Sequence, residues 1–165
     1  MENPIPISFL NDFIFCPRSI YYHQIYGNYN KQSYHQKPQI KGLAAHASID
    51  EKTYSTQKNI LMSCEVYSNE YNIYGKIDLF DIDKKILTER KREIKTIYDG
   101  YIFQLYAQYF CLTEMDYEVN QIRLYDLTHN KSYPLNLPIN DEIMHQKFKE
   151  LLEQIQAFNI NDIFF

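Results

Sequence analysis

The feature that most constrains the fold is a pair of strand-like segments, residues 72–83 and 85–92, in which apolar and polar side chains alternate. In an extended strand, residues two apart point to the same side of the sheet. Leu87, Glu89 and Lys91 therefore share one face, on which an apolar row continues into a charged pair. This pattern predicts a strand that passes from a core into a cleft.

The first of these segments carries a second carboxylate, Asp78, at the end of Gly75-Lys76-Ile77-Asp78. Asp78 and Glu89 offer hard oxygen ligands, and Lys91 offers an ammonium group nearby. Metal-assisted phosphodiester hydrolysis uses carboxylates to hold the metal and can use a lysine to orient or deprotonate the attacking water. Each of these residues would also suit the solvent-exposed end of a strand, and this alternative stays open. Gly75 weakens its strand, and such a glycine often marks the close approach of another backbone or a ligand.

The length of 165 residues favours one domain, residues 1–165, with an ordinary core. Helices are expected to begin at Ser8, acting as an N-cap, and to span residues 39–57, 101–115 and 139–158. Strands are expected at residues 60–71, 72–83, 85–92, 118–126 and 131–137, the last two forming a hairpin. This order predicts an α/β domain with a mixed central sheet flanked by helices.

The formal net charge of −4 argues mildly against bulk nucleic-acid binding, but local patches decide. One basic patch surrounds the proposed site, and it contains Lys84, Lys85, Arg90, Lys91, Arg92 and Lys95. No apolar run approaches the roughly 20 residues that span a bilayer, and the N-terminus lacks the pattern of a signal peptide. A cytoplasmic protein without membrane contact is therefore expected. Three isolated cysteines argue against a disulfide framework and make a poor zinc site.

Three further polar residues lie on expected helices. His46 follows Gly42 by four residues, which places both on one helical face, and its imidazole would favour Mn²⁺ over Mg²⁺ beside carboxylates. Gln104 and Gln108 are also four apart, so they could hydrogen-bond a carboxylate, a bound water or a DNA phosphate. An isolated histidine or glutamine on a helix is more often an ordinary surface or core residue, and this interpretation stays open for all three.

The ordered series His46, Gly75-Lys76-Ile77-Asp78, Glu89-Arg90-Lys91 and Gln104 resembles the RecB-type branch of the PD-(D/E)XK nucleases. Within that branch, the chain resembles the CRISPR-associated exonuclease family called Cas-four. The stretches Phe15-Cys16-Pro17-Arg18 and Gln104-Leu105-Tyr106-Ala107-Gln108-Tyr109-Phe110-Cys111-Leu112-Thr113-Glu114-Met115 carry this likeness, which covers about residues 5–158. The resemblance implies a restriction-endonuclease-like core.

The resemblance also implies a mechanism and partners. His46, Asp78, Glu89 and the backbone carbonyl of Arg90 would bind Mn²⁺ or Mg²⁺. Lys91 would position the nucleophilic water, and Gln104 would help to hold the site or the DNA strand. The substrate would be DNA that is single-stranded or bears overhangs. In the family, the enzyme trims spacer precursors together with the CRISPR integrase proteins.

The chain departs from the family at the iron–sulfur cluster. The family holds a [4Fe-4S] cluster with one cysteine near the N-terminus, which Cys16 matches, and three near the C-terminus. No cysteine follows Cys111 in this sequence, and neither Cys64 nor Cys111 falls at a matching position. We therefore expect that this chain cannot complete the cluster. Either the cluster has been lost or the natural chain continues beyond Phe165.

Two other functions stay open at this stage. The first is a catalytically weak DNA-binding or scaffolding subunit of the integration complex, in which the nuclease fold persists without activity. The second is a RecB-like repair or phage nuclease outside CRISPR systems. The complete set of charged residues around Asp78 and Glu89 favours an enzyme over the scaffolding subunit.

Overall fold

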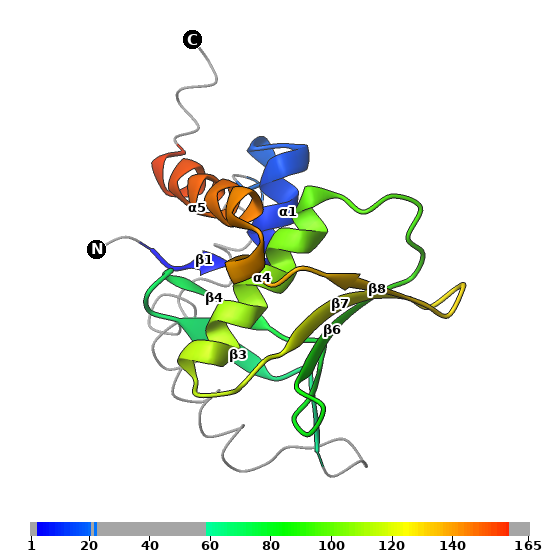
Figure 1. Ribbon diagram of the computed structural model, residues 1–165. Helices are drawn as coiled ribbons and strands as arrows, with labels where there is room; N and C mark the ends of the chain where they lie inside the picture. The colour runs from blue at the N-terminus through cyan, green and yellow to red at the C-terminus, as the bar shows by residue number, and fades with distance from the viewer. Residues whose placement is uncertain (1–2, 21, 23–58, 159–165) are drawn as a thin grey trace.

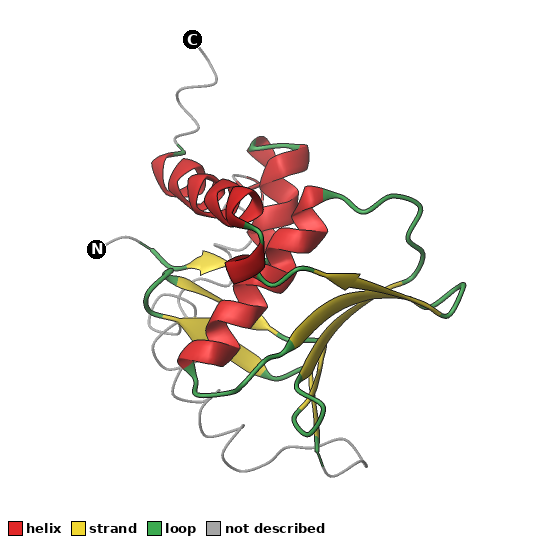
Figure 2. Ribbon diagram, viewed as in Figure 1, coloured by secondary structure: helices red, strands yellow, loops and turns green. Residues whose placement is uncertain are grey.

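The computed structural model describes residues 3–20, 22 and 59–158. The expected helix over residues 39–57, and with it His46, lies outside these residues. The α/β class is confirmed. Figure 1 shows the helices gathered on one side, while strands β6, β7 and β8 curve away from them, and Figure 2 shows the same division by colour.

The strands form two mixed sheets in place of the single central sheet that the sequence predicts. The smaller sheet has the order β1-β4-β3, and the larger one has the order β2-β5-β6-β7-β8. Among the strands of the described residues, the pairs β1–β4 and β6–β7 are parallel and the others antiparallel. The strands are β1 (Ile5–Pro6), β2 (Ile60–Met62), β3 (Glu65–Ser68), β4 (Ile73–Lys76), β5 (Leu79–Asp81), β6 (Ile86–Lys91), β7 (Gln121–Asp126) and β8 (Lys131–Leu135).

The division into two sheets arises because two expected strands each break in the middle. Ser63 adopts a positive φ of 53° between β2 and β3, and Ile77 and Asp78 leave the ladder between β4 and β5. The two breaks are hydrogen-bonded to each other, since the Ser63 amide donates to the Asp78 carbonyl (3.1 Å) and the Ile77 amide donates to the Cys64 carbonyl (2.9 Å). The chain therefore crosses from one sheet to the other at two adjacent points.

Each break also changes which side chains face the core. Ile73 and Ile77 are buried as expected, but Phe80, which simple alternation places on the polar face, is completely buried. The prediction for Phe80 was wrong because alternation holds only within an unbroken strand. In contrast, β6 and the β7–β8 hairpin lie where the sequence predicts them.

The α-helices that lie wholly within the described residues, together with a short 3₁₀ helix, pack against the sheets. They are α1 (Ser8–Phe15), α4 (Asp99–Glu114), the 3₁₀ helix η2 (Pro138–Asn140) and α5 (Glu142–Ala157). Ser8 is not the N-cap of α1, because Ile7 occupies that position and no side-chain bond caps the helix. The last helix begins three residues later than expected, because the Asp141 carboxylate accepts a hydrogen bond from the Met144 amide and so fixes its N-terminus.

Helix α4 occupies the centre of the molecule and connects the core to the site. It crosses strands β3 and β4, and α1 and α5 lie beside it (Figure 1). Phe148 of α5 is fully buried and contacts the rings of Phe103, Tyr106 and Phe110 along α4. This aromatic packing fixes α4 on the sheet, and with it the polar side chains that α4 presents to β6.

Gly75 has a packing role at some distance from the carboxylates. A Cβ atom at this position would lie 2.9 Å from Cβ of Ile7 and 3.0 Å from two further atoms of the same side chain. The Ile7 amide donates to the Tyr74 carbonyl at 2.8 Å, so the two backbones cannot easily separate. The close approach predicted for this glycine is therefore to the segment that follows β1.

We expect Gly75→Ala to destabilise the fold by about 1–3 kcal/mol, since the added methyl group overpacks a buried contact. Chemical denaturation measures this change. The matched control is Gly75→Ala combined with Ile7→Ala, which removes two of the three crowded atoms. The destabilisation of the double variant should then be smaller than the sum of the destabilisations of the two single variants. Strict additivity would contradict a direct clash.

Candidate active site

A cleft of about 560 Å³ opens beside β6, at the point where the chain crosses between the two sheets. Its lining includes Asp78 from the crossing between β4 and β5, Glu89 and Arg90 from β6, and Lys76 from β4. Ser63, Ile77 and Leu127 complete it. Both acidic residues proposed from the sequence therefore line the same cleft, although they come from different elements.

Arg90 holds the Asp78 carboxylate in a fixed position. Its guanidinium donates from one nitrogen to Oδ1 (2.8 Å) and from Nε to Oδ2 (3.0 Å), and its backbone amide also donates to Oδ2 (2.8 Å). Burial alone raises the pKa of Asp78, but the hydrogen bonds from Arg90 and the charges of Arg90 and Lys91 outweigh it and lower the pKa. Asp78 is thus an ionised carboxylate at neutral pH.

Glu89 is held from the opposite direction by helix α4. Gln108, which is 3% exposed, donates from Nε2 to Glu89 Oε2 at 3.0 Å. Lys91 Nζ lies 3.6 Å from Glu89 Oε1 and donates to Gln104 Oε1 at 3.0 Å. The two glutamines were predicted to share a helical face. Gln108 is hydrogen-bonded to the glutamate of β6, and Gln104 is hydrogen-bonded to its lysine.

A tyrosine that the sequence analysis missed completes the surroundings of Lys91. The Lys91 ammonium lies 4.6 Å from the ring centroid of Tyr101 in the first turns of α4, a cation–π contact. Lys91 and Tyr101 are ten residues apart in the sequence, and no local sequence pattern predicts a contact between them. Only the return of the chain from β6 into α4 brings the two side chains together.

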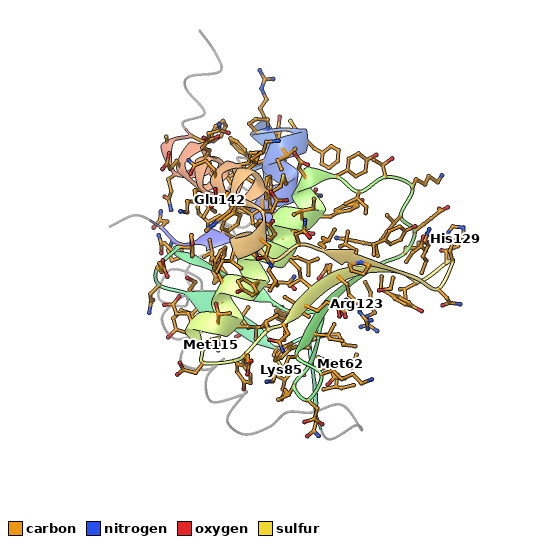
Figure 3. All side chains as sticks on the ribbon, viewed as in Figure 1. Met62, Lys85, Met115, Arg123, His129 and Glu142 are labelled. Carbon is orange, nitrogen blue, oxygen red and sulfur yellow. The ribbon has the colours of Figure 1, made fainter. Side chains whose placement is uncertain are left out.

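A buried aspartate fixes the segment between β6 and α4. Asp126 pairs with Lys91 in the β6–β7 register, and its Oδ2 accepts from the Ile94 amide at 3.0 Å. His129, labelled in Figure 3 on the β7–β8 turn, donates its amide to Oδ1 at 3.0 Å, and its Nδ1 lies 2.8 Å from Oδ2. Burial alone raises the pKa of Asp126, but these hydrogen bonds outweigh it and lower the pKa to about 2.

The donor set of the cleft fits a hard divalent cation. Asp78 and Glu89 provide carboxylate oxygens, which Mg²⁺ and Mn²⁺ accept. Asp78 accepts three hydrogen bonds from Arg90, so the guanidinium competes for the same oxygens. Within residues 3–20, 22 and 59–158, no group of three or more His, Cys, Asp or Glu side chains is placed to hold a metal ion.

The cysteines are not brought to this cleft. Cys16 is exposed near the end of α1, whereas Cys64 and Cys111 are buried in the core, and all three are free thiols. Burial raises the pKa of the Cys111 thiol well above its usual value. The iron–sulfur prediction and the prediction for His46 stay predictions.

Comparison with known proteins supports the fold. No protein-family model matches the chain. No curated protein matches it either. Among the solved structures that it resembles is the crystal structure of SSO0001, with 20% identity and a TM-score of 0.53 over 94% of this chain and 76% of that one. Such a likeness supports the α/β architecture alone. Across the described helices, none is long and apolar enough to cross a membrane.

We expect Asp126→Asn to reduce stability in a pH-dependent manner. The pKa of Asp126 falls from 3.8 to about 2 on folding, so the ionised carboxylate stabilises the native state fully above pH 3.8. This contribution is lost as the pH falls through about 2. Urea denaturation between pH 6 and the onset of acid unfolding should show the two proteins converging as the pH falls.

The control for this pH series is Glu153→Gln, which alters an exposed carboxylate on α5. It should track the wild-type protein throughout. A stability difference between Asp126→Asn and wild type that stays constant below pH 3.8, while both proteins are still folded, would contradict the assignment of the low pKa to Asp126.

Proposed function

We propose that this protein is a metal-dependent deoxyribonuclease that hydrolyses phosphodiester bonds. The observation that carries the proposal is the convergence of Asp78 and Glu89 on one cleft, with Lys91 Nζ 3.6 Å from Glu89 Oε1. Two hard carboxylates with an adjacent ammonium group provide the charges that such hydrolysis uses. The resemblance of the ordered motifs to RecB-type nucleases supports the same activity.

In this proposal, Asp78, Glu89 and the Arg90 carbonyl would hold Mn²⁺ or Mg²⁺, with His46 as a further ligand. When bound, the metal would polarise the phosphate and lower the pKa of a bound water. Lys91 then lies close enough to Glu89 to orient that water or the phosphate.

The polar residues of α4 act through these groups. Gln108 restrains the Glu89 carboxylate, and Gln104 restrains the Lys91 ammonium. Because both glutamines sit on a helix anchored in the core, the spacing of Glu89 and Lys91 is preorganised. Preorganised charge is the main source of electrostatic catalysis.

The proposed cellular role follows from the resemblance to the Cas-four family. The enzyme would act in the cytoplasm during CRISPR adaptation, trimming single-stranded or overhang-bearing spacer precursors with the integrase proteins. A RecB-like repair or phage nuclease would use the same site on other substrates.

A scaffolding role is the second candidate, and one observation favours it. Arg90 engages both oxygens of Asp78, a pairing that resembles a structural ion pair more than a vacant ligand. A protein of this kind would bind DNA without cutting it.

We expect Glu89→Ala and Lys91→Ala each to abolish DNA cleavage in Mn²⁺, by at least about a hundredfold, since each removes a charged group from the reacting centre. The assay uses single-stranded and overhang-bearing DNA labelled at either end. Glu153→Ala and Lys149→Ala, on the exposed face of α5, are matched controls and should cut normally. A parent protein that binds DNA but never cuts it would support the scaffolding role instead.

We expect Arg90→Met to increase the affinity for Mn²⁺ by roughly tenfold, because it removes a competing cation from Asp78 while retaining the backbone carbonyl. Calorimetric titration of Mn²⁺ measures this without any nuclease reaction. Asp78→Asn should weaken binding in the same assay. Unchanged or weaker Mn²⁺ binding in Arg90→Met would mean that the guanidinium does not compete for a metal site.

A further inference from the structure

A row of aromatic side chains leads away from Lys91 along the surface. The Tyr101 ring, which lies under the Lys91 ammonium, contacts Tyr98 edge to face, with ring centroids 5.4 Å apart. Tyr98 in turn contacts Phe15 edge to face at 5.5 Å. The row therefore joins the segment before α4 to the last residue of α1, and one of its ends lies at the proposed reacting centre.

The close packing of α1 on α4 builds this row. Gly100 lies in the first turn of α4, where a Cβ atom would overlap Oδ1 of Asn11 on α1. The absence of a side chain there lets the two helices approach each other. The approach places Phe15, at the C-terminus of α1, beside Tyr98.

The outer members of the row are exposed to a degree that core packing does not explain. Phe15 is 61% exposed and Tyr98 is 44% exposed, although both are large apolar rings. Exposed rings of this kind, set beside one another, offer flat faces for stacking. The planar bases of an unpaired nucleic-acid strand stack on such faces.

The charge around the row suits a polyanion. Residues 90–99 carry four Lys or Arg and two Asp or Glu, although the whole chain has a net charge of −4. Arg92 and Lys95 are exposed in the segment that leads to Tyr98. Asp126 holds this segment in place through the Ile94 amide. Basic groups next to exposed rings are the arrangement by which proteins bind single strands.

We propose that Phe15 and Tyr98 form a base-stacking platform for single-stranded DNA, with Lys91, Arg92 and Lys95 facing its phosphates. The platform would hold the unpaired bases next to the scissile phosphate at the carboxylate cleft. Duplex DNA would not bind there in the same way, because its bases are stacked on one another. This inference rests on the proposed nuclease function, and it adds the surface that selects unpaired bases.

The test measures binding alone, in EDTA, by fluorescence anisotropy of a labelled oligothymidylate. We expect Phe15→Leu and Tyr98→Leu each to weaken binding by roughly tenfold, as base–aromatic stacking contacts do. Tyr98→Phe keeps the ring and should bind like wild type. Ile143→Ala, which alters a residue of α5 that is 73% exposed, is the control for loss of apolar surface. Thermal unfolding checks that every variant is folded.

A second ligand, an oligonucleotide of the same length with abasic sites, tests whether the rings act on the bases. Wild type should bind it roughly a hundredfold more weakly than oligothymidylate, because both stacking contacts are lost, whereas Phe15→Leu combined with Tyr98→Leu should hardly distinguish the two. Equal binding of oligothymidylate by wild type and by both leucine variants would overturn the platform. So would loss of self-association in the leucine variants with DNA binding unchanged, because the rings would then bind a second copy of this chain.

The platform and the nuclease proposal fail in different ways. If the leucine variants bind normally while Glu89→Ala stops cleavage, the platform is wrong and the nuclease stands. If the platform binds as expected but no variant or parent cuts DNA in Mn²⁺, the platform stands as part of a DNA-binding subunit. If wild type binds no oligonucleotide even at low salt, the platform is wrong, and cleavage in Mn²⁺ alone decides the nuclease proposal.

Discussion

The crossing of the chain between its two sheets is the constraint on which the candidate site depends. Ser63 and Asp78 bond to each other there through their backbones, as do Cys64 and Ile77. The crossing lifts Asp78 out of the strand ladder, so its carboxylate is free to turn toward β6, where Arg90 binds it. A continuous strand would have placed Asp78 on the same face as Phe80, which is in the core.

Both faces of strand β6 contribute side chains to the site. Glu89 and Lys91 point toward α4, where Gln108 and Gln104 receive them, whereas the alternate residue Arg90 turns to Asp78. The parallel neighbour β7 supports this arrangement from inside, because buried Leu87 and Leu124 lie on the paired strands. The charges therefore rest on packed strands and a packed helix, and such support keeps charged groups in place without solvent reorganisation.

The sequence was sufficient for those parts of the fold that local patterns determine. The period-two pattern located β6, the hairpin spacing located β7 and β8, and the pairing of Glu89 with Lys91 on one face followed directly from alternation. Three features were beyond it. The crossing at Ile77 depends on a tertiary hydrogen bond, and the Arg90–Asp78 pair depends on that crossing. The burial of Asp126 depends on the return of the chain after β6. Each is a long-range contact, which alternation cannot report.

The connection between β6 and α4 also determines where the cleft and the exposed rings lie relative to Lys91. After Lys91, the segment is held by Asp126 through the Ile94 amide, and it enters α4 at Asp99 directly beside the end of α1. A carboxylate cleft on one side of Lys91 and exposed rings on the other are thus consequences of one connection. Because the connection has a buried, ionised anchor, the distance between cleft and rings is fixed by the fold. A strand of DNA laid along the rings would meet the carboxylates at a constant position, and a fixed distance of this kind determines where a nuclease cuts relative to the bases it binds.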